Sequence, residues 1–209
     1  MTAPGQAPAT STDLLVLHAL RCVGFAGLPR VAAASGLDEP DVESELIDLA
    51  VAGLVTHEGG GFGGWGLTEA GWTADAARIA EELHAAGARA AVAGAYDRFL
   101  VLNPELLDIC AAWQLRSIDG VVTANGHTDP AYDARVLGRL TDLDQRAQGV
   151  CADLSAALPR FGRYRIRLAE ALARARAGAL DYVTDSFASY HIVWFQLHED
   201  LLVTLGIPR

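Results

Sequence analysis

The order of elements predicted for residues 13–68 restricts the fold of this chain more than any other feature of the sequence. Apolar residues recur at helical spacing in three consecutive segments, residues 13–25, 28–35 and 40–52. The following segment, GLVTHEGGGFGGWGLT, contains two short strand patterns joined by a glycine-rich tip. Three helices followed by a two-stranded hairpin are the element order of a winged helix-turn-helix.

The pattern beyond the hairpin is helical almost to the C-terminus, with few interruptions. Asn103-Pro104 is expected to start a helix, and the one long loop is predicted at residues 117–129. Asp129-Pro130 supplies an N-cap and a first-turn proline for the amphipathic helix that follows.

Two further helices complete the predicted fold, an arginine-rich one at residues 161–177 and a last one at residues 181–205. The fold class is therefore mainly α, with one small β-hairpin. The predicted organisation is a disordered tail at residues 1–12, a winged helix-turn-helix domain at residues 13–80 and an all-α region at residues 81–209.

Two stretches of the N-terminal part, LPRVAAASGLDEPDVESELIDLAVAGLV and GWGLTEAG, resemble a known family. The first is similar to the helix-turn-helix of MarR-like bacterial winged-helix transcription regulators, and the second to the W-x-LT-x-x-G that ends their wing. The resemblance covers residues 14–71. It implies that the third helix enters the major groove of DNA and that the hairpin approaches the minor groove or the backbone. The remaining half is similar to uncharacterised actinobacterial proteins with the same start, which implies no activity for it.

Acidic residues dominate the surface that this resemblance assigns to DNA. The chain has a formal net charge of −10, and residues 31–77 contain nine acids with no Lys or Arg. The groove-facing positions of the family fall near Asp41, Glu43, Ser44 and Asp48. Carboxylates there repel phosphates, although a carboxylate can accept a hydrogen bond from cytosine N4. The candidate DNA-binding residues are Arg30, Ser44, His57 and Arg78. Alternatively, residues 38–48 form a solvated helix face or a docking surface for a protein partner.

Cysteine usage and hydropathy indicate an intracellular environment. Cys22, Cys110 and Cys151 are far apart and lie in apolar helical patterns, so we expect buried free thiols in a reducing cytoplasm. The N-terminal residues lack a basic start followed by an apolar run, and no apolar stretch approaches the length of a membrane span. The acidic balance also disfavours an anionic membrane surface.

The last predicted helix contains the densest group of aromatic and histidine residues. At helical spacing Tyr190, Trp194 and His198 share one face, and His191 lies on a neighbouring stripe. Such a helix could line a ligand pocket, or it could be a core or dimer seam with hydrogen-bonded histidines. The candidate ligand-binding residues are Trp113, Arg163, Arg167, Tyr190, His191, Trp194 and His198.

The arginine-rich helix, RFGRYRIRLAEALARARAG, holds the only basic cluster in the sequence. Arg163, Arg167 and Arg174 fall on one helix face, with Glu170 placed to bridge the last two. The cluster could bind an anionic ligand, such as a carboxylate or the phosphate of a CoA thioester. It could also dock the acidic helix of a partner subunit, or form ordinary surface ion pairs.

Motifs for catalysis, metals or cofactors are weak. His191 and His198 lack the spacing of a metal site, and GGGFGG leads into a strand rather than a helix, unlike a phosphate-binding loop. His127 near Asp129 could form a hydrolytic dyad, but no nucleophile elbow accompanies it. We therefore assign no catalytic residue, metal ligand or cofactor, and an enzyme is the less favoured class.

The sequence favours a cytoplasmic, ligand-responsive winged-helix transcription regulator that binds DNA as a homodimer. A small anionic or hydrophobic effector would bind among the C-terminal helices. The alternative is a protein derived from a winged helix that no longer binds DNA. It would act as a protein-interaction module, or as a small-molecule-binding protein or enzyme through its helical half.

Overall fold

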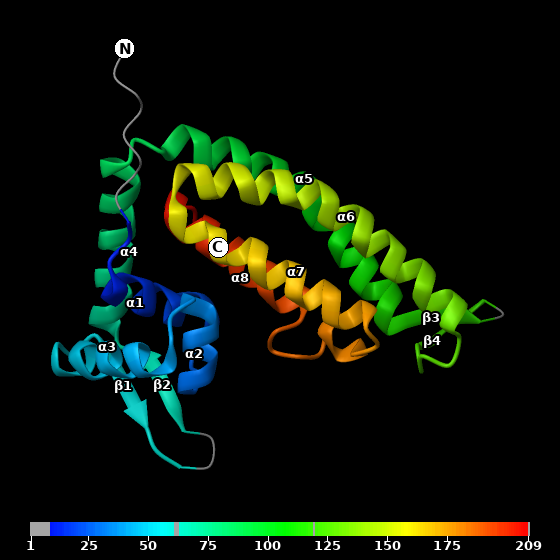
Figure 1. Ribbon diagram of the computed structural model, residues 1–209, viewed down its shortest axis with the longest axis horizontal. Coiled ribbons are helices and arrows are strands. Elements are labelled where there is room, and N and C mark those ends of the chain that lie inside the picture. The colour runs from blue at the N-terminus through cyan, green and yellow to red at the C-terminus, as the bar shows by residue number, and fades with distance from the viewer. Residues whose placement is uncertain (1–8, 61–62, 119, 209) are drawn as a thin grey trace.

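The computed structural model describes residues 9–60, 63–118 and 120–208, and within them the fold is mainly helical (Figure 1). The predicted tail falls largely on residues 1–8, and the hairpin tip partly on residues 61–62, both outside the described residues. The elements are α1 (Thr12–Val23), α2 (Leu28–Ser35), α3 (Glu39–Val51), β1 (Val55–Glu58), β2 (Gly64–Leu67), α4 (Glu69–Ala85), α5 (Arg89–Gln114), β3 (Leu115–Ile118), β4 (Val121–Ala124), α6 (Pro130–Ala157), η1 (Pro159–Phe161), α7 (Gly162–Arg176), η2 (Leu180–Tyr182) and α8 (Tyr190–Leu205).

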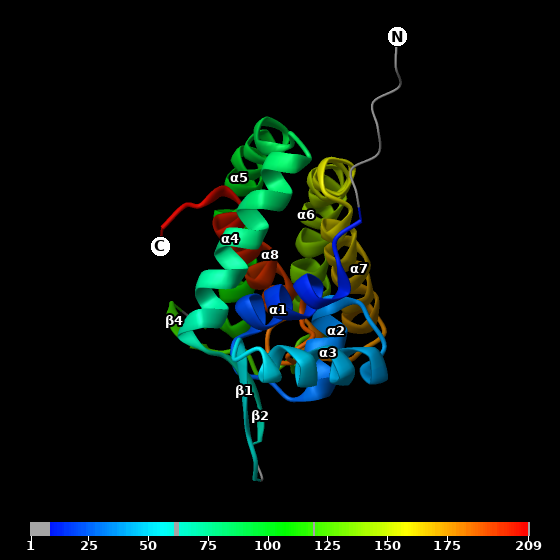
Figure 2. The same ribbon diagram turned by 90° about the vertical axis from the view of Figure 1, so that its left-hand side faces the viewer.

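Helices α1–α3 and the antiparallel hairpin β1–β2 form an N-terminal unit at one end of the molecule (Figures 1 and 2). Their buried apolar residues form a core of their own, which includes Leu17, Val31 and Leu46. Leu67 pairs with Val55 across the hairpin, and Gly36 ends α2 in the left-handed conformation. The three helices and the hairpin therefore lie where the sequence predicts them.

Helices α5–α8 form a second, larger core, which we call the helical bundle. The long helices α5 and α6 run side by side, and α7 and α8 pack along them (Figure 1). Helix α4 joins the two parts, because Ala74 packs on the N-terminal core while Leu83 is buried in the core of the bundle. The predicted boundary at residue 80 therefore falls inside one continuous helix.

Three local expectations differ from the structure. Helix α5 continues through Pro104, which is exposed, so that water can solvate the carbonyl left without an N–H donor. The expected loop at residues 117–129 overlaps the hairpin β3–β4, which begins at Leu115. The last helix starts at Tyr190 rather than at residue 181, because Ser189 caps it by accepting a hydrogen bond from the Ile192 N–H at 3.3 Å.

The expectation of buried free thiols is confirmed. Cys22, Cys110 and Cys151 are buried and form no disulfide. Burial raises the pKa of Cys110 to about 11 and that of Cys151 to about 12. Both groups are therefore neutral thiols that pack as small apolar side chains. Among the described residues, none of the helices is long and apolar enough to cross a membrane.

Candidate functional site

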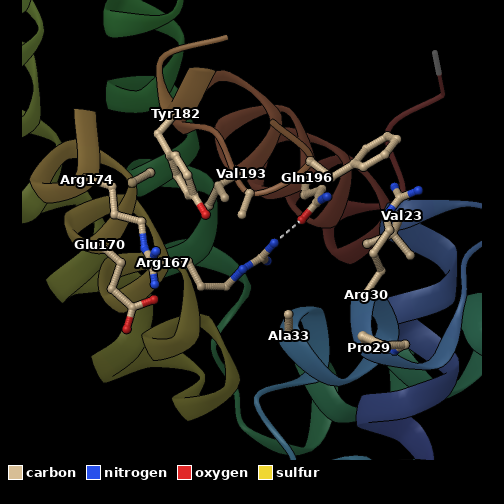
Figure 3. Close-up of a pocket in the computed structure, with 13 residues that line it drawn as sticks. Val23, Pro29, Arg30, Ala33, Arg167, Glu170, Arg174, Tyr182, Val193 and Gln196 are labelled. Carbon is tan, nitrogen blue, oxygen red and sulfur yellow. Dashed lines mark hydrogen bonds between the residues drawn. The ribbon is translucent and has the colours of Figure 1, made fainter. Parts of the chain in front are cut away.

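A cavity of about 320 Å³ lies at the seam between the N-terminal unit and the helical bundle (Figure 3). The N-terminal unit contributes the end of α1 and the first turns of α2, and the bundle contributes α7, α8 and the segment between them. The lining residues are Val23, Pro29, Arg30, Ala33, Arg167, Glu170, Ala171, Arg174, Tyr182, Phe187, Ala188, Val193 and Gln196. A ligand in this cavity would therefore touch both parts of the molecule.

Three arginines reach this cavity from two elements, and each is paired with an uncharged group. The Arg30 guanidinium lies 3.9 Å from the centroid of the Phe187 ring, and that of Arg174 lies 5.1 Å from the Tyr182 ring. Arg167 Nη2 donates to Gln196 Oε1 at 2.5 Å (Figure 3).

These guanidiniums have no carboxylate in direct contact. In the described part of the chain, none of Arg30, Arg167 and Arg174 belongs to an ion pair. Burial lowers the pKa of Arg30 and also that of Arg167. Of the residues that the structure describes, Glu170 is the only acid that lines the cavity. The cavity is thus a partly desolvated site with an excess of positive charge.

Of the ligand-binding candidates predicted from the last helix, two are core residues with satisfied polar atoms. Tyr190 is buried and its hydroxyl donates to Asp144 Oδ1 at 3.1 Å. Trp194 is buried against Phe99, at 4.5 Å between ring centroids, and its Nε1 donates to Asn103 Oδ1 at 2.9 Å. These contacts agree with the alternative interpretation of the last helix, in which its aromatic residues belong to a core with hydrogen-bonded polar groups.

The other ligand-binding candidates are spread over several places. Arg167 lines the cavity, whereas Arg163 is buried beside it in an ion pair with Asp200. His191 is half-buried, which lowers its pKa, and His198 packs at 5.1 Å from the Phe99 ring centroid. Trp113 is buried near the β3–β4 hairpin, with its ring centroid 4.6 Å from that of His127.

The residues predicted to bind DNA do not form one surface. Arg30 lines the cavity with its guanidinium over the Phe187 ring, and Arg78 forms an ion pair with Asp13 of α1. The His57 ring packs against Trp65 across the hairpin, at 4.6 Å between centroids. Only Ser44 lies on the outer face of α3, where it is exposed.

The outer face of α3 is exposed and acidic. Asp41, Glu43 and Asp48 are exposed together with Ser44, whereas Val42 and Leu46 are buried in the N-terminal core. The helix therefore has the amphipathic form predicted for it, and its solvent-facing side carries carboxylates.

A buried ionic network joins the same two parts of the molecule next to the cavity. His18 of α1 is fully buried, with Nδ1 2.9 Å from Asp75 Oδ1 of α4 and Nε2 3.0 Å from Asp200 Oδ1 of α8. Arg160 Nη1 donates to Asp200 Oδ1 at 2.5 Å, and Arg163 Nη2 donates to Asp200 Oδ2 at 3.0 Å. Four elements are thus tied through one carboxylate.

The ionisation of this network follows from its contacts. Burial alone would lower the pKa of His18, but the neighbouring Cys22, Asp200 and Asp75 raise it well above its ordinary value. Burial would raise the pKa of Asp200, but Arg160 and His18 hold it well below its ordinary value. His18 is therefore an imidazolium that donates from both ring nitrogens.

Among the described residues, His18, Cys22 and Asp200 form a group that could hold a metal ion. One donor atom of each lies within 4.8 Å of the others, and Asp75 on Nδ1 would orient the imidazole. This group was not identified from the sequence, although the spacing of His18 and Cys22, four residues apart on one helix, was a signal that could have indicated it. With Glu82 paired to Arg160, three positive and three negative side chains already balance in the network. We therefore assign the group a structural role.

His127 and Asp129, which were considered as a possible dyad, have different partners in the structure. His127 Nδ1 lies 3.1 Å from Asp133 Oδ2, whereas Asp129 Oδ1 caps α6 by accepting from the Tyr132 N–H at 3.0 Å. Asn125 is buried and donates to Asp133 Oδ1 at 2.9 Å. His127 adopts a φ of 54°, which these contacts hold in place. The cluster fixes the base of the β3–β4 hairpin.

Comparison of the chain with known proteins finds no relative. No protein-family model, no curated protein and no solved structure matches the chain.

The cavity was hidden from sequence analysis because its walls are distant in the chain. Arg167 and Arg174 were recognised as one basic face, but Arg30 lies more than a hundred residues earlier. Phe187 and Tyr182 belong to a segment that was expected to be helical. The sequence shows that Arg30 and Ala33 are close together on one predicted helix. It does not show that they lie opposite residues of α7 and α8 across a cavity.

Proposed function

We propose that the protein is a ligand-responsive transcription regulator of the winged-helix class. Helices α1–α3 and the hairpin β1–β2 would form the winged helix, with α3 in the recognition position. The element order and the MarR-like motifs within residues 14–71 support this assignment.

The observation that carries the proposal is the cavity shared by α2 and by α7 and α8. A ligand that binds there contacts the helix-turn-helix and the bundle at once, through residues such as Arg30 and Arg167. It would therefore favour one relative position of the two parts over others. The fixed ionic network beside the cavity would act as the pivot.

DNA is the first partner of α3 under this proposal, and the regulator would act as a homodimer. The bundle helices would provide the dimer interface, so that a change at the cavity alters the distance between two copies of α3. The match to two half-sites one or more helical turns apart would change with it.

A second candidate partner follows from the charge of α3. Arg30 and Arg78 are engaged elsewhere, and the exposed face carries Asp41, Glu43 and Asp48. Such a face favours a basic protein surface over a phosphate backbone. The protein would then transmit the ligand signal by docking rather than by contact with DNA.

One assay separates the two partners. The full chain is titrated against duplex DNA from the region upstream of its own gene, at low and at physiological salt, in a mobility-shift experiment. A specific shift that survives competitor DNA supports the regulator that binds DNA. No shift at low salt rejects DNA as the partner, and specific recovery of one basic host protein on immobilised wild-type chain, lost when α3 is neutralised, supports docking.

A further inference from the structure

We propose that the cavity at the seam recognises a small phosphate monoester with an apolar or aromatic body. The inference deepens the proposed function and rests on it for its regulatory meaning. Its physical basis is the excess charge of the cavity, the neutral partners of its arginines and the helix dipoles whose positive ends border it.

The net positive charge of the lining residues favours a ligand that carries two negative charges. Arg30, Arg167 and Arg174 bring three positive charges and Glu170 one negative charge, which leaves two positive charges. A phosphate monoester carries a charge of about −2 at neutral pH, whereas a carboxylate carries one negative charge. Only the phosphate neutralises the excess with one group.

The present partners of the arginines are weaker than a phosphate would be. Arg167 donates to the neutral amide oxygen of Gln196, and Arg30 lies over the Phe187 ring. Guanidinium hydrogen bonds to phosphate oxygens are charge-assisted and bidentate. Exchange of the ring and amide contacts for phosphate oxygens would therefore be favourable, and it would release Phe187, which is 66% exposed.

The first turns of two helices also border the cavity. Pro29 and Arg30 are in the first turn of α2, and Val193 ends the first turn of α8. The N-terminal end of a helix favours negative charge through its dipole. In α8 the N–H groups of His191 and Ile192 already donate to the Val183 carbonyl and to Ser189 Oγ, so the helices add their dipoles to the arginines and no free N–H groups.

The other lining residues determine the size and polarity of the part of the ligand that is not phosphate. Ala33, Ala171 and Val193 are small and apolar, and Tyr182 offers an aromatic wall. A volume of about 320 Å³ is at the lower end for ligand pockets, so the body is small. Glu170 lies beside Arg174, whereas Arg30 is at the opposite side of the cavity with Arg167 between them (Figure 3). The phosphate is therefore expected between Arg30 and Arg167.

The test uses calorimetric titration of the full chain at about pH 7.5, where the probe is a dianion. The probes are phenyl phosphate, benzoate, phenol and inorganic phosphate. Phenyl phosphate should bind at least about tenfold more tightly than benzoate or inorganic phosphate, and phenol should not bind. Equal affinity for benzoate and phenyl phosphate, or no binding of phenyl phosphate, would overturn the proposal.

Variants locate the binding. Arg167→Gln should weaken phenyl phosphate by about tenfold or more, whereas Arg165→Gln, an exposed arginine of the same helix, should leave it unchanged. An equal loss in both variants would show general charge attraction and would also overturn the proposal. Thermal melting of both variants checks their folding.

The titration contains no DNA, so its result does not depend on the outcome of the DNA assay. If phenyl phosphate does not bind, the proposal that α3 contacts DNA is still tested separately by the mobility-shift experiment.

Discussion

His18 Nε2 lies 3.0 Å from Asp200 Oδ1, and this contact joins the first helix of the N-terminal unit to the last helix of the bundle. The same imidazolium donates to Asp75 of α4, so one buried side chain bridges three helices. Helices α1 and α8 both border the cavity. This contact therefore holds two of its walls in a fixed relative position.

Removal of the charge at Asp200 should destabilise the whole chain. Asp200→Asn leaves Arg160, Arg163 and His18 buried without their shared carboxylate, and we expect a loss of about 3–5 kcal/mol in the free energy of unfolding. Asp153→Asn is the matched control, since Asp153 pairs with Arg98 at the surface, and it should cost less than about 1 kcal/mol. Urea unfolding measures both, and equal effects would contradict a central role for Asp200.

The stability of the chain should fall on the alkaline side because of His18. Its folded pKa is raised above the ordinary 6.5, so its contribution is complete below pH 6.5 and is lost as the pH rises through the folded value. Asp200 has the opposite effect, on the acidic side, because its folded pKa is lowered. Its contribution to the free energy of unfolding is complete above pH 3.8 and is lost as the pH falls through its folded pKa.

Urea unfolding across the alkaline range measures this dependence. His18→Gln should be less stable at pH 6 and should lack the alkaline decline that His18 causes in the wild type. An identical decline in the variant and the wild type would assign the effect to another group.

Gly71 should tolerate no side chain, because a Cβ there would lie 1.9 Å from the Leu54 carbonyl oxygen. Gly71→Ala therefore forces α4 away from the hairpin, and we expect a cost of about 3 kcal/mol. Gly138→Ala in α6 meets nothing within 4 Å and should stabilise the chain by about 0.5–1 kcal/mol. Thermal melting of the pair gives opposite shifts if the packing is as described, and shifts of the same sign if it is not.

The charge of α3 should limit DNA binding. Neutralisation of Asp41, Glu43 and Asp48 to their amides removes three carboxylates from the exposed face and should raise the affinity for duplex DNA by roughly tenfold at low salt. The control for charge alone is a variant that neutralises three exposed acids of the bundle, Asp108, Asp142 and Asp153, to their amides. If the triple variant binds DNA no better than the wild type, α3 does not face the duplex.

The N-terminal elements were predictable because each has a local signal. The prolines at positions 29 and 40 and the apolar spacing of α1–α3 are independent of the rest of the chain. Hairpin β3–β4 was missed because both strands are largely exposed, so no alternation of buried and exposed residues marks them. The role of His18 could not be predicted from the sequence, since its two carboxylate partners lie 57 and 182 residues further along the chain.

The most direct test of the central claim is the affinity of the full chain for its own upstream DNA, measured by fluorescence anisotropy with and without saturating phenyl phosphate. If the cavity and α3 are coupled, the affinity should change by at least about fivefold. The change should be lost in Arg167→Gln and kept in Arg165→Gln. An affinity that is the same with and without the ligand, or no binding to DNA in either state, would contradict the proposal that this protein is a ligand-responsive regulator acting on DNA.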